Sequence, residues 1–183
     1  MRTLSELTPF VNEPFLDFSQ EGEAAAFQQA LNKVEASFPV VVRLWLDGTD
    51  REGKAGTFES HDPGKPARVV ANSAKGSRED ALAAIVGAHK AFGTWSRLSA
   101  EERAEYFFRA ARIMRLRKNE FSAMMVFEVG KNWAEADGDT AEAIDFLEFY
   151  AREALRYARR QPITPMPGEH NELVYVPLGV GAV

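Results

Sequence analysis

Residues 173–183 read Leu-Val-Tyr-Val-Pro-Leu-Gly-Val-Gly-Ala-Val, an almost uninterrupted apolar run. Such a run is typical of a β-strand that is buried on both faces, which requires neighbouring strands and covering helices. The sequence supplies no such elements after this run. It therefore predicts a terminal strand of a buried sheet and indicates that the chain is the front part of a larger protein.

A long amphipathic helix is predicted upstream of this run, from about Trp133 to Tyr157. A Pro- and Gly-rich crossover, Pro162 to Gly168, joins the two. The apolar residues of the helix recur at helical spacing and so lie on one face. Acids gather in its first turns and arginines in its last, as the helix dipole favours. The apolar positions are Ile144, Leu147, Ala151 and Leu155.

Four more helical segments are predicted towards the N-terminus. One begins at Ser19 as the N-cap and buries Phe27, Leu31, Val34 and Phe38. A second runs from Ser77, with Asp80 in a capping box, to Gly93, and its expected apolar face is Leu82, Ile85, His89 and Phe92. A third starts at the capping box Ser99/Glu102 and has the stripe Ala104, Phe107, Ala111 and Met114. The fourth, Phe121 to Val129, ends at Gly130.

Three strands are expected between the first two of these helices. Val40 to Leu46 is apolar and β-branched, and Asp47-Gly48 is a turn signal, so we expect a strand that enters a hairpin. Gly56 to Ser60 is the expected second strand, and Ala67 to Ala71 a short third one. Before the first helix, residues 4–18 combine Pro9 and Pro14 with single apolar residues, which indicates an extended arm.

Composition excludes several classes of protein. The 183 residues carry a net charge of −5 and form no basic patch, which argues against binding nucleic acid. There is no cysteine, so these residues provide no disulfide, thiolate metal site or cysteine nucleophile. No apolar run approaches the roughly 20 residues that span a bilayer, and the N-terminus resembles no targeting peptide. We expect a cytoplasmic protein without membrane or nucleic-acid partners.

Few residues suggest chemistry by spacing alone. His61, His89 and His170 form no catalytic or metal motif, and Gly179-x-Gly181 lacks the third glycine and the following helix of a dinucleotide fingerprint. The cluster Phe127 to Lys131 indicates a helix C-terminus whose lysine contacts the last carbonyls. The sequence predicts no metal site.

One side of the last helix carries three carboxylates, Glu135, Asp139 and Glu142, at positions i, i+4 and i+7. They could bind a hard cation or the ammonium group of a ligand. Alternatively, they form a solvated acidic face near a helix N-terminus, which helix electrostatics alone would favour.

The order of elements resembles the front third of an aldehyde dehydrogenase. The resemblance rests on the hairpin, Trp95-Ser96-Arg97 with the following helix, Glu128-Val129-Gly130-Lys131, and Pro177-Leu178-Gly179-Val180-Gly181. Further segments resemble the Δ1-pyrroline-5-carboxylate dehydrogenases. These are Asn12-Glu13-Pro14-Phe15, Arg117 to Phe121, Asn132 to Asp137, Thr140 to Phe146 and Pro167-Gly168-Glu169.

This resemblance implies a fold class and a division of the chain. The fold is α/β: the N-terminal part of an aldehyde dehydrogenase, mostly α-helical here, with a β-hairpin and a terminal strand. Residues 1–76 would form an arm, a helix and a hairpin that serve oligomerisation. Residues 77–183 would be a helical portion that leads into the first strand of the NAD-binding domain.

The resemblance also implies a function. Such enzymes oxidise L-glutamate γ-semialdehyde to L-glutamate with NAD, and they work as homo-oligomers. Their catalytic cysteine, general-base glutamate, oxyanion-site asparagine and NAD-binding motifs have no counterpart here, so we expect no catalytic residue and no cofactor in this chain alone. The position that transfers is Glu142, implied to lie near the substrate's ammonium group. The alternative is a non-catalytic helical module for binding or oligomerisation.

Overall fold

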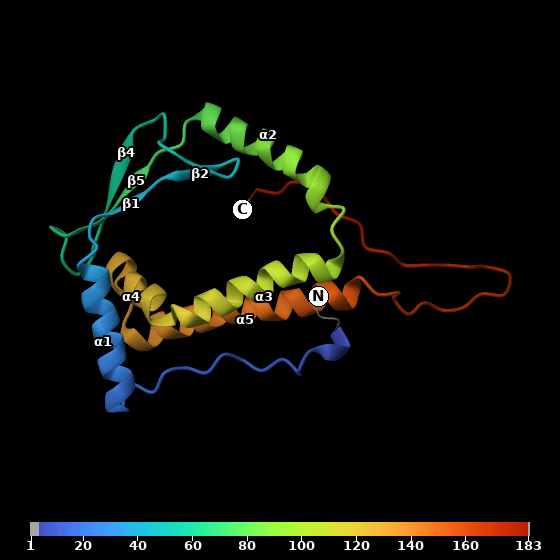
Figure 1. Ribbon diagram of the computed structural model, residues 1–183, viewed down its shortest axis with the longest axis horizontal. Coiled ribbons are helices and arrows are strands. Elements are labelled where there is room, and N and C mark those ends of the chain that lie inside the picture. The colour runs from blue at the N-terminus through green and yellow to red at the C-terminus, as the bar shows by residue number, and fades with distance from the viewer. Residues whose placement is uncertain (1–3, 183) are drawn as a thin grey trace.

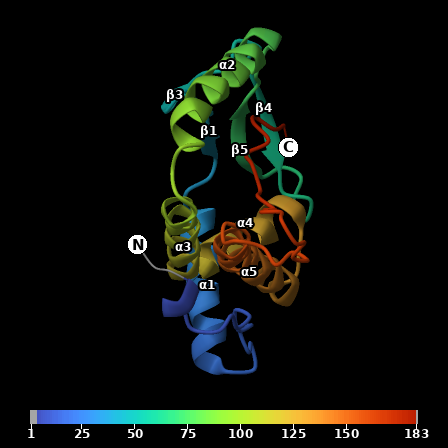
Figure 2. The same cartoon turned by 90° about the vertical axis from the view of Figure 1, so that its right-hand side faces the viewer.

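A computed structural model describes residues 4–182, and this part is mostly helical. Its α-helices are α1 (Glu21–Glu35), α2 (Arg78–Trp95), α3 (Ala100–Leu116), α4 (Lys118–Val129) and α5 (Trp133–Tyr157), preceded by a 3₁₀ helix η1 (Leu4–Glu6). Its strands are β1 (Val40–Val42), β2 (Leu44–Leu46), β3 (Thr49–Arg51), β4 (Thr57–His61) and β5 (Val69–Ala74). Figures 1 and 2 show α2 and the strands on one side and the other four α-helices opposite them. The predicted mostly helical fold with a β-hairpin is confirmed.

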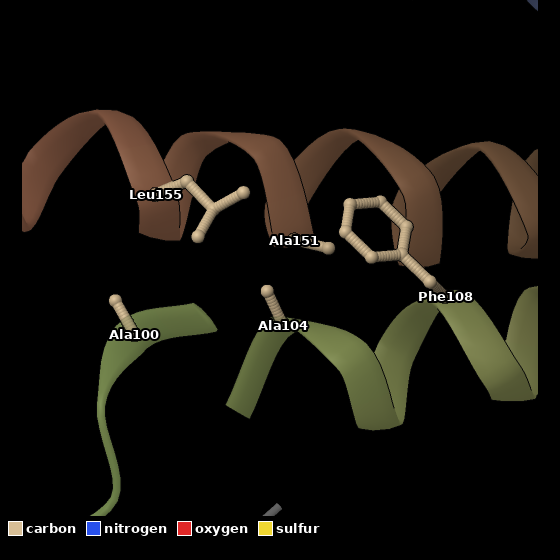
Figure 3. Close-up of a cluster of buried hydrophobic side chains, with 5 residues drawn as sticks. All are labelled: Ala100, Ala104, Phe108, Ala151 and Leu155. Atoms are coloured by element: carbon tan, nitrogen blue, oxygen red, sulfur yellow. The ribbon is translucent and has the colours of Figure 1, made fainter. Parts of the chain in front are cut away.

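The helices α3 and α5 pack side by side through small residues. Ala100, Ala104 and Phe108 of α3 lie against Ala151 and Leu155 of α5 (Figure 3). Alanines let the two backbones come close, and the Phe108 ring fills the remaining space. The predicted stripe placed Phe107 inward, but Phe107 is 41% exposed and Phe108 only 5%. The buried stripe of α3 therefore contains Phe108 in place of Phe107.

A second core joins α1 to α4 and to the start of α5. Phe27, Leu31 and Val34 of α1 are buried, as predicted, against Ala123 of α4. The Phe27 ring centroid lies 5.0 Å from that of Trp133, and Phe18 of the arm completes the cluster. Aromatic groups in such tilted and edge-on arrangements attract one another beyond the burial of their surface.

The N-terminal arm, residues 7–18, runs along α5 (Figure 1). Lys118 and Asp137 are 8% and 1% exposed, and the Lys118 Nζ lies 2.8 Å from the Asp137 Oδ1. The same Nζ donates to the Pro14 carbonyl, and the Asp137 Oδ2 accepts from the Leu16 backbone N–H, both at 2.8 Å. We call these four residues the arm clasp. It joins the arm, α4 and α5 by charge-assisted hydrogen bonds.

The sheet pairing differs from the prediction. The expected strand Val40 to Leu46 is divided at Arg43: β1 pairs in parallel with β5, whereas β2 pairs antiparallel with β3. The hairpin turn holds Asp47 and Gly48 at φ values of 51° and 76°, which bring β3 back onto β2. The expected second strand is β4, which pairs with β5 and not with β2.

Several helix ends agree with the sequence and others do not. The capping boxes at Ser77/Asp80 and Ser99/Glu102 are both formed, and Gly130 adopts the predicted left-handed conformation with φ 71°. The N-cap of α1 is Gln20, because the Ser19 hydroxyl donates instead to the Asp17 carboxylate at 2.6 Å. Helix α2 continues past Gly93 to Trp95.

The expected apolar face of α2 is not buried. Leu82 and Ile85 are 48% and 49% exposed, and His89 is exposed. No described helix packs along this face, since α2 contacts β2 and lies across from α3 and α5 (Figure 2).

The predicted terminal strand is not formed either. Residues 158–182 have no regular hydrogen-bonded structure, and Leu178 is fully exposed. The segment returns towards the molecule through the edge-on contact of Tyr175 with Tyr157, whose ring centroids lie 4.8 Å apart. A strand requires a hydrogen-bonded neighbour, and no strand within residues 4–182 pairs with this segment. Val183 lies outside the described residues.

The arm clasp generates a prediction about stability. Lys118→Met should lower the free energy of unfolding by about 3–5 kcal/mol, because it leaves the Asp137 charge buried without its partner. Lys131→Met is the matched control, because it removes the ion pair of Lys131 with Asp139, which lies on α5 like Asp137. The Lys131 and Asp139 side chains are 34% and 42% exposed, so this substitution should cost about 0–1 kcal/mol. Urea denaturation of the chain measures both. Equal losses would show that the clasp contributes no more than a surface pair.

A second prediction concerns pH. Hydrogen bonds from the backbone N–H groups of Ser77 and Lys54 lower the pKa of Asp80 below 3.8. A carboxyl with a lowered folded-state pKa stabilises the fold above its unfolded pKa, and this contribution is lost as the pH falls through the folded pKa. The destabilisation by Asp80→Ala should therefore be largest at neutral pH and should become smaller as the pH falls below 3.8. Urea midpoints of both proteins across this range give the measurement, and a constant difference would contradict it.

Candidate functional site

The first two-thirds of α5 carries acids and no bases. Asn132 caps the helix by accepting a hydrogen bond from the Glu135 backbone N–H at 2.9 Å. Residues 133–150 contain no Lys, Arg or His and six acids: Glu135, Asp137, Asp139, Glu142, Asp145 and Glu148. The partners of these carboxylates distinguish structural acids from a candidate site.

Four of the six acids have partners. Asp137 belongs to the arm clasp, and Asp139 forms an ion pair with Lys131. The Asp145 carboxylate accepts from the Glu13 backbone N–H at 2.7 Å and from the Asn12 side chain at 2.8 Å. Glu148 lies 3.6 Å from Arg115 and 3.5 Å from Arg152. These four carboxylates fix α5 to the arm, to α3 and to the preceding loop.

Glu135 and Glu142 remain without an ion pair or side-chain hydrogen bond to the described residues, and both are exposed. Glu135 lies in the first turn of α5, where the helix dipole stabilises an acid. Glu142 is the tenth residue of the helix, beyond the reach of that effect. Its carboxylate is therefore free to bind a cation from outside the chain.

The carboxylate triad of the sequence does not act as one site. Asp139 is committed to Lys131, and among residues 4–182 no three His, Cys, Asp or Glu side chains are placed to hold a metal ion. The spacing of Glu135, Asp139 and Glu142 thus places them on one side of the helix, but it does not make them the ligands of one metal ion.

Exposed aromatic side chains accompany Glu142 on α5. Phe146, Tyr150 and Phe149 are 51%, 58% and 41% exposed. Their rings are in contact in the order Phe146, Tyr150, Phe149, and Phe10 of the arm adds a fourth ring. We call these four residues the aromatic row. It gives the exposed side of α5 an apolar surface beside a free carboxylate.

The other residues noted in the sequence form no comparable site. The His61 ring nitrogens lie 2.8 Å from the Pro66 carbonyl and 3.2 Å from Glu59. Lys131 pairs with Asp139 and not, as predicted, with the last carbonyls of α4. Gly179 and Gly181 lie in the irregular segment, away from any strand-to-helix turn. His170 lines a surface groove of about 510 Å³ with residues 160–166, 169 and 171, and none of the acids of α5 lines this groove.

The residues that hold the site in place could not be found from spacing. No motif or spacing singles out Asp137 or Asp145, and the arm residues that donate to their carboxylates are more than 100 positions away. The segments Asn12-Glu13-Pro14-Phe15 and Thr140 to Phe146, noted separately for their resemblance, are in fact hydrogen-bonded to each other.

These contacts predict effects of different size on stability for two acids three residues apart. Glu142→Ala should change the free energy of unfolding by less than about 0.5 kcal/mol, because the carboxylate contacts no described group. Asp145→Ala should cost about 1–3 kcal/mol, because it leaves the Glu13 N–H without its acceptor. Urea denaturation tests both. A large loss for Glu142→Ala would make this residue structural.

Comparison with known proteins gives concordant results. Residues 50–183 match the model of the aldehyde dehydrogenase family. The 1-pyrroline-5-carboxylate dehydrogenase of Bacillus pumilus is 48% identical over 176 residues, which is 96% of this chain and 34% of that protein. The chain therefore spans about a third of the length of the relatives that it matches.

Solved structures that are similar to this chain include the same kind of enzyme. The 1-pyrroline-5-carboxylate dehydrogenase of Thermus thermophilus, as its R100A mutant, superimposes with a TM-score of 0.88 at 43% identity, over 94% of this chain and 33% of that one. A Thermus 1-pyrroline-5-carboxylate dehydrogenase with bound NAD gives the same values. The Δ-pyrroline-5-carboxylate dehydrogenase of Mycobacterium tuberculosis gives a TM-score of 0.86 at 27% identity, over 97% and 33% of the chains.

Proposed function

The chain belongs to the aldehyde dehydrogenase family, and we propose that it supplies the N-terminal part of an enzyme that oxidises L-glutamate γ-semialdehyde to L-glutamate with NAD. Relatives that share 43–48% identity over nearly the whole chain are 1-pyrroline-5-carboxylate dehydrogenases. The observation that carries the proposal is the free carboxylate of Glu142. It lies in the segment Thr140 to Phe146, which resembles these enzymes.

The role of Glu142 is to bind the substrate's ammonium group. Glutamate semialdehyde carries an ammonium group at one end and the reacting aldehyde at the other, so a carboxylate that holds the first end orients the second. A charge-assisted hydrogen bond from an ammonium group to a carboxylate is short and stronger than a neutral one. Three of the paired acids of α5, Asp137, Asp145 and Glu148, keep the backbone around Glu142 in place, because they attach it to the arm, α4 and α3.

The chemical step itself must use residues that this sequence does not contain. Covalent oxidation of an aldehyde begins with a thiolate, and the chain has no cysteine. Among residues 4–182, no glycine-rich turn leads from a strand into a helix to hold the pyrophosphate of NAD. The described residues thus do not fit NAD, and we assign the nucleophile and the cofactor to the part of the relatives that this chain does not cover.

We further propose a cytoplasmic homo-oligomer in which residues 1–76 provide the contacts between subunits and residues 77–183 lead into the cofactor domain. Exposed apolar side chains on the strands, including Val41 and Phe58 at 65% and 47%, support an interface there. None of the described helices is long and apolar enough to pass through a bilayer.

A hybrid enzyme tests the function. This chain would replace the matched third of the Thermus enzyme, and NADH formation would be followed with glutamate semialdehyde and with an aliphatic aldehyde that lacks the ammonium group. Glu142→Ala should lower kcat/KM for glutamate semialdehyde by about tenfold to hundredfold, equivalent to about 1–3 kcal/mol. The value for the aliphatic aldehyde should stay unchanged.

Two controls accompany this test. Glu135→Ala should leave both values unchanged, because this acid is explained by the helix dipole. The chain alone, without the Thermus portion, should form no NADH, because it has no thiolate. Equal losses for both aldehydes in Glu142→Ala would refute the assigned role. A folded but inactive hybrid would favour the alternative of a non-catalytic helical module.

A further inference from the structure

We propose that Phe146 contributes a second, aromatic contact to the substrate's ammonium group and so acts with Glu142 as a specificity-determining residue. This inference rests on the proposed function, since it concerns the same end of the same substrate. The exposed ring of Phe146 belongs to neither of the two described hydrophobic cores.

Phe146 follows Glu142 by four residues on α5, and residues at this spacing lie on the same helix face with Cβ atoms about 5–6 Å apart. Glu142 is exposed, and Phe146 is 51% exposed, so both present their side chains to the same outside space. An ammonium group is small enough to contact a carboxylate and a ring across this distance, since cation–π contacts form within about 6 Å of the ring centroid.

Neighbouring rings restrict the orientation of Phe146. Phe146 is stacked on Tyr150 with centroids 5.8 Å apart and an interplanar angle of 29°. Tyr150 in turn meets Phe149 edge-on at 5.5 Å, and Phe149 meets Phe10 of the arm at 5.5 Å. The aromatic row therefore limits the rotation of Phe146 before any ligand binds. A side chain that is already ordered loses less entropy on binding.

Within residues 4–182, no Arg or Lys side chain lies over the Phe146 ring. Six other rings in the described structure have an Arg or Lys side chain over or near them, within 4.0–5.9 Å of the centroid. They are Phe58, Tyr106, Phe108, Phe121, Phe127 and Tyr157. Phe146 differs from these six rings, and residues 133–150 contain no basic side chain. An exposed ring without an internal cation, beside a carboxylate without an internal partner, is complementary to a cation from outside the chain.

The hybrid enzyme described above tests this inference through three substitutions. Phe146→Leu keeps an apolar side chain but removes the ring, so kcat/KM for glutamate semialdehyde should fall about threefold to tenfold. The value for the aliphatic aldehyde without an ammonium group should stay unchanged. Phe146→Tyr keeps the aromatic face and should retain the original kcat/KM. Phe107→Leu, at a 41% exposed ring on α3, is the matched control and should change neither value.

The outcomes separate the two proposals. If Phe146→Leu lowers kcat/KM equally for both aldehydes, or if Phe146→Tyr is as damaging as Phe146→Leu, the ring packs against protein and the inference is wrong. If Glu142→Ala discriminates between the aldehydes and Phe146→Leu does not, this inference alone fails. If neither substitution discriminates, the assignment of the ammonium site to α5 fails with it.

Discussion

The ion pair between Lys118 and Asp137 connects three parts of the chain that are distant in sequence. Lys118 begins α4, Asp137 lies in the second turn of α5, and the hydrogen bonds of both reach Pro14 and Leu16 in the arm. Both side chains are nearly buried, so each charge depends on the other and on these backbone groups. A buried charge that loses its partner is strongly unfavourable, and this makes the arrangement of arm, α4 and α5 specific.

The acids of α5 fall into two groups with different roles. On the side towards the arm and α3, the acids Asp137, Asp145 and Glu148 are paired and hold the helix in place. On the exposed side, Glu142 has no partner within the described chain, and the exposed Phe146 follows it one turn along the helix. A carboxylate on a rigid helix binds a cation with less loss of freedom than one on a loop. The three paired acids thus hold in place the helix that carries Glu142.

The sequence predicted the local parts of the fold well and the distant contacts poorly. Capping boxes and helical periodicity located α2, α3 and α5, because these signals depend on residues within a few positions of one another. The division of the first strand at Arg43 and the pairing of β1 with β5 depend on partners about 30 residues away. The apolar run at residues 173–182 has no partner strand in the described structure, so its pattern did not produce a strand.

The same limit applies to the site. Spacing gave Glu135, Asp139 and Glu142 equal weight, and only the resemblance distinguished Glu142. The structure adds an independent reason, because Asp139 is paired and Glu135 is explained by the helix terminus. Periodicity also could not show that the aromatic residues near Glu142 form a connected row, since Phe10 of the arm lies far away in sequence.

The most direct measurement is a crystal structure of the hybrid enzyme with its product, L-glutamate, bound. The account predicts the ammonium nitrogen about 3 Å from a carboxylate oxygen of Glu142, within hydrogen-bonding distance. A glutamate whose ammonium group is held by other residues, with Glu142 directed into solvent or into a protein contact, would contradict it.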